Sequence, residues 1–467
     1  MIDELIRSRK IKVESRKNIY MKKIVFVLLA LSMSLMSMAE DHVMAATKGS
    51  KSNGKSEYPD TLSLNLKEAQ DYAVDQNRTL KNASLAVQEA YAQRWQTIAA
   101  MLPQVDGSYS YNDYLGYKAT MSMMGREVEI GMPNQGSLVV TASVGINGQG
   151  IVGALLNNVA IDMKKISLEK SEVELRGSVM TSYVSLLALQ SITELLDSSL
   201  VNIEELERMT QNAVDAGASE QTTADQIHVR VNTMRNNINV QRNNIALAYN
   251  SLKVLLDVPV ETYLILEDDL DAILSPEAVL NLLSANFDVH NNLNYQLLEK
   301  SAELARRNVH MAGWAYGPTL SLAYNYTNQQ YYGDGGMRMT PPNVIQVGVR
   351  LPLWSSGKRA AGVVEKKIAY QEALNTLSET TDQLAIQYNQ LCYNLSSAYQ
   401  TYMTDKESLE VAQRVFASIT QKYKFGASSM LELTNSSNDL INAQSTYVQA
   451  MLSLVNAQVE LEQFLNN

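Results

Sequence analysis

Residues 440–461 read LINAQSTYVQAMLSLVNAQVEL, and residues 231–252 read VNTMRNNINVQRNNIALAYNSL. In both stretches apolar residues recur every seven positions, a spacing that predicts a helix packed along a supercoiled seam. The stretches lie 209 positions apart, and the same shift places Gly426 on Gly217. Such a match indicates a duplication, so the chain is interpreted as two similar halves. The matched apolar residues are Leu440, Tyr447, Leu454 and Leu461 in the second stretch and Val231, Ile238, Ile245 and Leu252 in the first.

Each half also contains two segments in which apolar and polar residues alternate. This period of two predicts β-strands with one apolar and one polar face. Within each half, a polar loop separates the two segments, at 113–136 and at 327–343. The predicted strands are 104–112 and 137–147 in the first half and 319–327 and 344–354 in the second.

Long helices are predicted after each strand pair, because all nine prolines lie outside 134–258 and 353–467. A helix of roughly 65 residues would be about 100 Å long. Gly217 and Gly426 suit the turns where the chain reverses, since glycine accepts the positive φ at a helix C-terminus. The predicted helices are 153–216 and 219–256 in the first half and 358–425 and 428–465 in the second.

These elements predict the domain organisation. A flexible tether precedes the first repeat, and a short mixed connector separates the repeats, each of which begins with a further helix. The predicted segments are 1–39 as upstream extension and signal peptide, 40–61 as tether, 62–256 as first repeat, 257–292 as connector and 293–467 as second repeat.

The composition predicts an exported protein that does not bind nucleic acid. Residues 21–39 combine a basic start, an apolar stretch and a small-x-small cleavage site, which is typical of a secretory signal peptide. The formal net charge of −10 argues against a nucleic-acid partner. No apolar stretch beyond the signal is long enough to predict a transmembrane helix. The four histidines lack metal-ligand spacing, so no metal or cofactor is predicted.

Strands of this length could cross a membrane only as part of a closed barrel. Four strands cannot close one, and an open sheet edge in lipid is prohibitively costly. Two copies would supply eight strands and three would supply twelve, and twelve leave room for a pore. The alternative is a soluble β-sandwich patch with aromatic edges. Tyrosines suited to an interfacial girdle are Tyr109, Tyr111, Tyr324 and Tyr326.

At this point residues 62–467 resemble the TolC-type outer-membrane efflux channels. The resemblance rests on the duplicated order of helix, β-hairpin and long helical hairpin, and on short motifs that flank the strands and the second tip. It implies a mixed α and β fold in which three chains share a 12-stranded β-barrel, continued by a periplasmic α-helical coiled-coil barrel. The motifs are Leu102-Pro103-Gln104, residues 351–357 (LPLWSSG), residues 423–428 (YKFGAS) and Glu432-Leu433.

The resemblance also implies a function, partners and a gate. The chain would be a homotrimeric exit duct in the outer membrane of a Gram-negative bacterium, working with a periplasmic adaptor and an inner-membrane pump of the RND or ABC type. The adaptor would dock at the helical tips, around Gly217, Gly426, Ala427 and Ser428. The family's acidic gate positions hold Glu432 and Asn435 here, with Thr223 and Asp225 in the comparable turn of the first repeat.

Two further interpretations of these residues stay open at this point. Glu432 could simply be a solvated acid at a helix start, where negative charge is favoured. The chain could also be a trimeric coiled-coil adhesin anchor or a periplasmic scaffold, although an adhesin anchor carries its strands contiguously at the C-terminus. No nucleophile–base pair, phosphate loop or carboxylate pair indicates an enzyme.

Overall fold

The computed structural model describes residues 61–123, 126–273, 276–332 and 341–466. The predicted signal peptide at 1–39 and residues 40–60 of the predicted tether lie outside the described residues. The chain forms two compact units. The sheet unit includes residues 86–162 and 303–370, and the hairpin unit includes residues 163–302 and 371–466. Each unit therefore contains residues from both sequence repeats.

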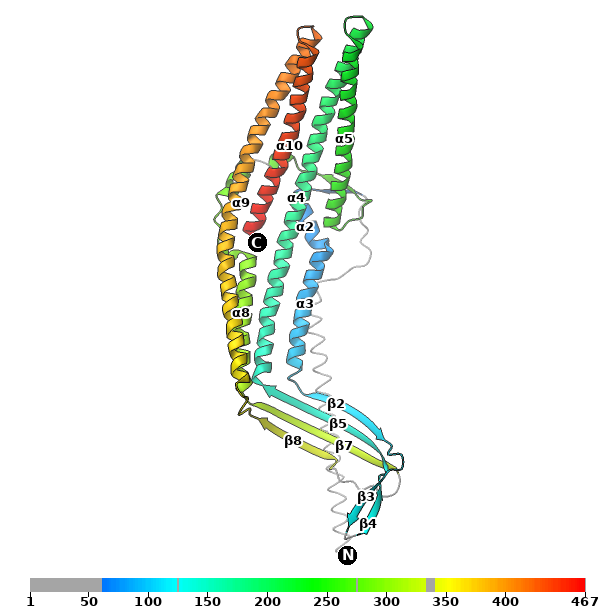
Figure 1. Ribbon diagram of the computed structural model, residues 1–467, viewed down its shortest axis with the longest axis vertical. Coiled ribbons are helices and arrows are strands. Elements are labelled where there is room, and N and C mark those ends of the chain that lie inside the picture. Colours follow the sequence, from blue (N-terminus) through cyan, green and yellow to red (C-terminus); the bar gives the residue numbers. More distant parts are fainter. Residues whose placement is uncertain (1–60, 124–125, 274–275, 333–340, 467) are drawn as a thin grey trace. The chain divides into compact units, whose positions relative to one another are not determined.

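The sheet unit is built on a four-stranded antiparallel sheet in the order β2-β5-β7-β8 (Figure 1). The central pair, β5 and β7, comes from different repeats and stays in register from Asn134↔Tyr332 to Asn147↔Thr319. The outer strands β2 and β8 each have one neighbour within the described chain. The strands are β2 (Gln104–Asn112), β5 (Asn134–Asn147), β7 (Thr319–Tyr332) and β8 (Asn343–Arg350).

The strand bounds differ from the sequence prediction at three of the four strands. Only β2 has the predicted limits, whereas β5 and β7 extend beyond 137–147 and 319–327. β8 ends before the predicted 354, because Pro352 has no N–H to donate to a neighbouring strand. The segment 113–136, predicted as a loop, contains a second hairpin of β3 (Lys118–Met123) and β4 (Arg126–Gly131).

Four long helices form two helical hairpins; α4 and α9 begin in the sheet unit and continue into the hairpin unit, which contains all of α5 and α10. α4 begins before the predicted 153 because the Asn147 side chain accepts a hydrogen bond from the Gly150 N–H (2.7 Å) and so starts the helix at once. The other ends lie within two residues of the prediction. The helices are α4 (Gly148–Asp215), α5 (Gln221–Leu256), α9 (Lys358–Lys424) and α10 (Met430–Asn466).

The remaining elements are short except for α2, α3 and α8, which precede the strand pairs. The first residues predicted as helical instead form a strand, β1, which pairs in parallel with β6 of the connector. These elements are β1 (Thr61–Leu64), α2 (Leu66–Gln76), α3 (Arg78–Ala99), β6 (Tyr263–Leu266), α6 (Leu270–Ile273), α7 (Pro276–Leu283), η1 (Val289–Asn291), α8 (Leu293–Gly313) and η2 (Trp314–Tyr316).

The core of the hairpin unit contains two apolar clusters along the seams of the four long helices. Tyr183 of α4 is fully buried, and its hydroxyl donates to the Leu64 carbonyl at 3.0 Å, which ties β1 to α4. This apolar packing bears on the prediction that no transmembrane helix follows the signal. An 18-residue window of α4 has a mean hydropathy of 1.3, enough to suggest a membrane span, but half of that window is buried within the protein. The apolar character of α4 is explained by its central place among the helices.

Candidate functional site

The four-stranded sheet has one apolar and one polar face, because the register is unbroken across all four strands. The exposed fractions of Ile345, Val347 and Val349 are 72%, 71% and 71%, so the apolar face is open in the single chain. A lipid bilayer is an environment that would accept such a face. Its residues are Val105, Gly107, Tyr109, Tyr111, Leu138, Val140, Ala142, Val144, Ile146, Leu320, Leu322, Tyr324, Tyr326, Ile345, Val347 and Val349.

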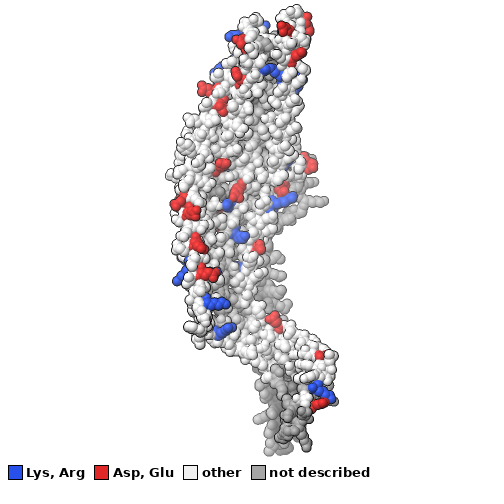
Figure 2. All heavy atoms as spheres, viewed as in Figure 1, with Lys and Arg blue, Asp and Glu red and all other residues white. Residues whose placement is uncertain are grey.

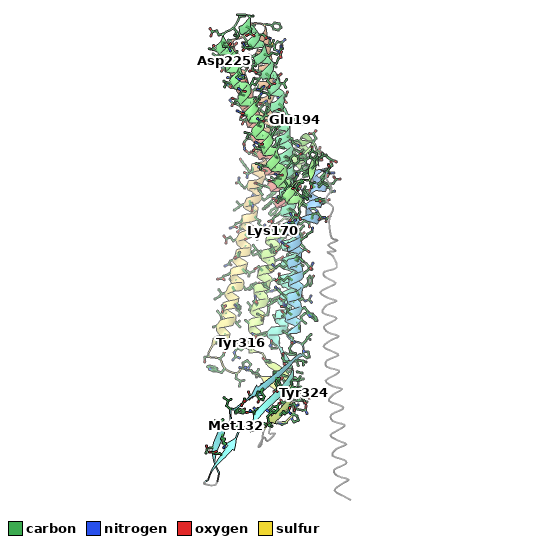
Figure 3. All side chains as sticks on the ribbon, turned by 90° about the vertical axis from the view of Figure 1, so that its right-hand side faces the viewer. Met132, Lys170, Glu194, Asp225, Tyr316 and Tyr324 are labelled. Atoms are coloured by element: carbon green, nitrogen blue, oxygen red, sulfur yellow. The ribbon has the colours of Figure 1, made fainter. Side chains whose placement is uncertain are left out.

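The four predicted girdle tyrosines all lie on this apolar face. Tyr324 projects from the sheet in Figure 3, and its hydroxyl donates to the Asn343 side chain at 2.8 Å. Tyr111 packs edge-on against Tyr332, with ring centroids 5.8 Å apart. The tyrosines gather toward the end of the sheet where β7 and β8 are joined, and Leu320 and Val349 occupy the other end. An aromatic band at one edge of an apolar face fits a membrane–water boundary.

The opposite face is lined by small and polar side chains that bond across the strands. Thr141 donates to Asn325 at 2.8 Å, and Asn325 donates to Gln346 at 3.4 Å. Few charged side chains lie over the sheet in the visible face of Figure 2, whereas they are scattered over the helices. This polar face could line a water-filled lumen. It includes Asp106, Ser108, Ser110, Thr141, Ser143, Ser321, Asn325, Gln346 and Arg350, with Val139, Ala323 and Val344 among them.

The turns at the tips of the two helical hairpins have the same backbone conformation. Gly217 and Gly426 have φ of 71° and 72°, values that an L-residue rarely adopts. The N–H of the residue after each glycine donates to a carbonyl five residues earlier. Ala218 donates to the Ala213 carbonyl (2.8 Å), and Ala427 donates to the Lys422 carbonyl (2.9 Å). These are Schellman turns, which satisfy the last carbonyls of α4 and α9. The equal turns extend the duplication from sequence to geometry.

Glu432, the predicted gate acid, takes part in a capping box at the start of α10. Its carboxylate accepts from the Ser428 hydroxyl (2.6 Å) and the Ser429 N–H (3.1 Å), and its own N–H donates to the Ser429 hydroxyl (3.2 Å). The hydrogen bond from Ser428, followed by that from the Ser429 backbone, lowers the pKa of Glu432. In the single chain, then, Glu432 is an ionised helix cap.

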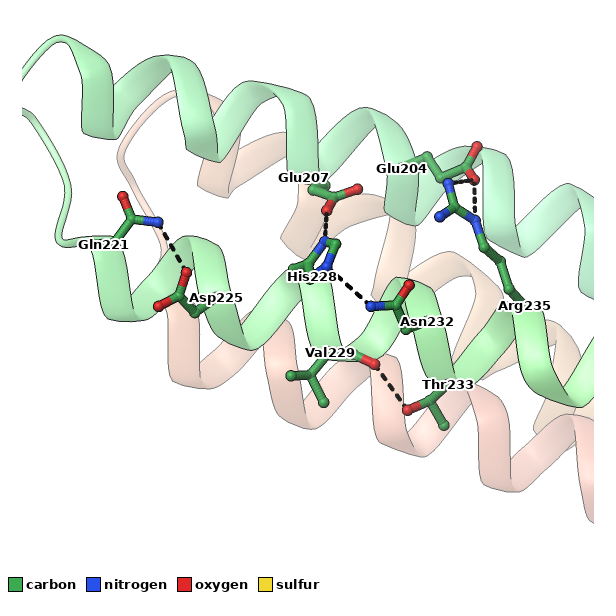
Figure 4. A network of polar contacts seen from close by, with 9 residues as sticks. All are labelled: Glu204, Glu207, Gln221, Asp225, His228, Val229, Asn232, Thr233 and Arg235. Carbon is green, nitrogen blue, oxygen red and sulfur yellow. Dashed lines mark hydrogen bonds and ion pairs between the residues drawn. The ribbon is translucent and has the colours of Figure 1, made fainter.

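The other predicted gate residues share no contact with Glu432 among the bonds found in the described chain. Asn435 is exposed and Thr223 is half-buried. Asp225 lies near the tip of α5, where its carboxylate accepts from Gln221 at 2.9 Å (Figures 3 and 4). Within one chain these residues do not form one site, so any ring of carboxylates would require several chains.

Sequence reasoning missed Arg230, which lies between the two hairpins near their tips. Its guanidinium extends from α5 to α10 and donates to the Thr434 carbonyl (3.4 Å) and the Asn438 side chain (3.2 Å). Burial lowers the pKa of Arg230. Its neighbour Val231 is fully buried on the heptad seam, but the sequence pattern contains no signal for a contact with the second repeat.

A groove of about 540 Å³ also lies between the hairpins, lined by residues of α4, α9 and α10. Its walls include Ser199, Phe416 and Lys424, and Gln444 donates across it to Ser199 at 3.0 Å. No cluster of three or more histidine, cysteine or acidic side chains that could hold a metal occurs in the part of the chain that the structure describes.

A family model described as "Outer membrane efflux protein" matches residues 71–257 and 290–467, which include both hairpins and all four strands of the sheet. The chain belongs to this family. It is therefore an outer-membrane efflux channel subunit with its helices in the periplasm of a Gram-negative cell, in a family of channels rather than enzymes. The predicted family, fold class, function and location are confirmed, and the adhesin and scaffold alternatives are not favoured.

Curated relatives of this efflux protein have low sequence identity to it, but the similarity extends over about two thirds of the chain. The pyoverdine export outer membrane protein OpmQ of Pseudomonas aeruginosa is 22% identical over 328 residues, 69% of this chain and 68% of that protein. The outer membrane efflux protein BepC of Brucella suis is 20% identical over 316 residues, 65% of this chain and 67% of that protein.

Solved structures agree with the fold. The outer membrane protein VceC of Vibrio cholerae superposes with a TM-score of 0.68 at 14% identity, covering 86% of this chain and 96% of that chain. The CmeC outer membrane channel of Campylobacter jejuni superposes with a TM-score of 0.66 at 16% identity, covering 86% and 85%.

Proposed function

We propose that three copies of this chain form one exit duct, in which twelve strands close a barrel and twelve helices form the periplasmic tunnel. The observation that carries the proposal is the two-faced sheet with a free edge on both β2 and β8 among the described strands. The apolar face would meet lipid and the polar face would line the lumen. An open edge cannot persist in hydrocarbon, so other copies of the sheet must cover both edges.

The mass of the detergent-extracted protein tests this proposal. Native mass spectrometry should give three times the chain mass of the mature protein, and brief cross-linking in outer-membrane vesicles should stop at the trimer. A monomer in the outer membrane would contradict the closed barrel.

The duct would receive its cargo from an inner-membrane pump of the RND or ABC type through a periplasmic adaptor at the helical tips. Family membership supports a role within a tripartite efflux system. The curated relatives are named for exporting pyoverdine, or toxin and drugs. We extend to this chain only the general role of exporting molecules. Cross-linking from a photoreactive residue at Ala427 should capture an adaptor from the periplasm, whereas the same residue at Gly131 of β4, in the sheet unit, should capture none.

Glu432 would gate the duct if three copies bring the tips together. Three carboxylates in a confined mouth repel one another, and the repulsion grows as the local dielectric falls. The ring would attract cations and disfavour anions. The ring would also raise the pKa of Glu432, in the opposite direction from the Ser428 hydrogen bond within one chain.

Planar-bilayer recordings distinguish a gating role of Glu432 from a role only in capping α10. Glu432→Gln should reduce cation selectivity and weaken block by multivalent cations, while glutamine keeps an acceptor oxygen for the capping box. Asp225→Asn, in the comparable turn of the first repeat, should have a smaller effect. If Glu432→Gln leaves selectivity and block unchanged, the carboxylate only caps α10.

A further inference from the structure

The four strands of the sheet contain only two charged side chains, Asp106 and Arg350. They have opposite signs and lie on opposite outer strands, Asp106 on β2 and Arg350 on β8. A lone charge on an edge strand can serve to discourage random pairing. Two complementary charges on the two edges of one sheet can instead select each other in a neighbouring copy.

The register places both charges on the polar face, with Arg350 six positions further along the strands than the row of Asp106. Asp106 lies opposite Thr141, Thr141 lies opposite Asn325, and Arg350 lies opposite Thr319. Asn325 and Thr319 are an even number of residues apart on β7, so all these side chains share one face. Asp106 is near the start of β2 and Arg350 is the last residue of β8.

We propose that β2 of one subunit pairs with β8 of the next in the register that sets Asp106 directly opposite Arg350. This inference rests on the proposed trimer and adds the register that joins its subunits. The direction is correct, because β2 and β8 run oppositely within the sheet and so would continue the antiparallel alternation.

The proposed register also matches the rest of both strands. It places Tyr109 opposite Val347 and Tyr111 opposite Ile345, so apolar side chains meet on the lipid face. It pairs residues 106–112 of β2 with residues 344–350 of β8, so only Asn343 of β8 has no partner, while Gln104 and Val105 at the start of β2 fall opposite Pro352 and Leu351, just beyond the end of β8. A slip of one residue would bring the apolar face of one subunit beside the polar face of the next, which the bilayer forbids. Slips of two residues keep the faces but separate the charges, and one of them brings Pro352, which lacks an N–H, opposite Asp106.

Disulfide trapping distinguishes these registers. Ser110→Cys would be combined with Gln346→Cys for the proposed register, and with Val344→Cys or Gly348→Cys for the two slips. Directly opposite residues lie about 5 Å apart, within disulfide reach, whereas diagonal neighbours lie about 7–8 Å apart. Cys392, the single native cysteine, would be replaced by serine throughout. β5 and β7 separate β2 from β8 within one chain, so any bond must join two subunits.

The expected result is a covalent trimer on a non-reducing gel for the Gln346→Cys pair alone. A trimer trapped through Val344→Cys or Gly348→Cys would overturn the register and leave the trimer standing. A protein that is monomeric by native mass spectrometry would overturn both. A trimer that none of the three pairs traps would likewise overturn the proposed register.

Exchanging the charges of Asp106 and Arg350 tests the proposed register independently. Asp106→Arg and Arg350→Asp should each lower the temperature at which the detergent-resistant trimer dissociates, because like charges would then face each other across the joint. Combining the two substitutions restores opposite signs and should recover most of the loss. A double variant as weak as the two losses added together would contradict the pairing of these side chains.

Discussion

In the hairpin of α4 and α5, three positions spaced by seven carry exposed polar side chains that pair with acidic residues. In the hairpin of α9 and α10, the equivalent positions are buried. His228, Arg235 and Arg242 pair with Glu207 (2.6 Å), Glu204 (2.7 Å) and Asp197 (3.2 Å) of α4, and the first two of these pairs appear in Figure 4. A shift of 209 positions leads to Ser437, Gln444 and Met451, whose exposed fractions are 6%, 3% and 2%.

The difference arises from which neighbour each helix meets. α10 presses this face against α4, where Gln444 donates to Ser199 across the interface at 3.0 Å. α5 turns the same face toward solvent, where charges cost little and long side chains can pair loosely. Two copies of one sequence thus form the same local hairpin, but the side chains at matching positions follow their separate surroundings.

The sharpest way to break this comparison is to exchange the residues at one matched position. Met451→Arg would bury a cation without a partner and should lower the free energy of unfolding by about 3 kcal/mol or more. Arg242→Met removes only an exposed ion pair and should change it by less than about 1 kcal/mol. Urea unfolding of both detergent-purified variants measures the contrast, and equal losses would show that the two positions have similar surroundings.

A second matched pair concerns close packing. Gly177 of α4 is buried, and a Cβ there would collide with the side chain of Gln463, whereas its equivalent Ile386 is 69% exposed. Gly177→Ile should cost about 1–3 kcal/mol through overpacking. Adding Gln463→Ala should recover part of that cost in thermal unfolding. Ile386→Gly should cost about 1 kcal/mol, from helix propensity alone. No recovery with Gln463→Ala would place the strain elsewhere.

The helix starts at the two tips also differ. α10 has the capping box of Ser429 and Glu432, while Glu220 at the start of α5 makes no side-chain capping bond. Ser429→Ala should cost about 1 kcal/mol of local stability, and Glu220→Ser with Thr223→Glu should gain a similar amount in α5. Amide hydrogen-exchange protection of the first turn of each helix measures both.

The capping box should also respond to acid. Because the pKa of Glu432 lies below its ordinary value of 4.5, the ionised form stabilises the folded tip. That contribution is present above pH 4.5 and is lost as the pH falls through the lowered folded pKa. Protection of the first turn of α10 should decline there in the wild type and not in Glu432→Gln. A rise in protection as the pH falls toward 4.5 would instead indicate repulsion among three carboxylates, because protonation would relieve it.

The smallest effect should come from the ion pairs of the first hairpin. Arg235→Gln gives α5 the residue found in α10 and should lower the free energy of unfolding by no more than about 0.5 kcal/mol, since the side chains are 51% and 37% exposed. The difference should disappear in 1 M NaCl, where screening acts within about 3 Å. A loss that persists at high salt would identify a packing role for Arg235.

Parts of the candidate site were predictable from sequence because local physics decides them. Alternation fixed the two faces of the strands, and the seven-residue period with Gly217 and Gly426 fixed the hairpins and their turns. The capping box could also have been found, since Ser429 followed by Glu432 at three residues is its usual pattern. The β3–β4 hairpin was missed because its segment was interpreted only as a polar loop.

The remainder depends on residues far apart in the chain. β1 pairs with β6 across some 200 residues, and Arg230 contacts α10 across a similar sequence separation. Neither contact can therefore be recognised from the neighbouring sequence. Periodicity by itself determined which elements form and which face of each is apolar. Only the tertiary structure decided which of two equivalent faces is buried, because that depends on the helix lying opposite, and a duplicated sequence contains the same local pattern in both places.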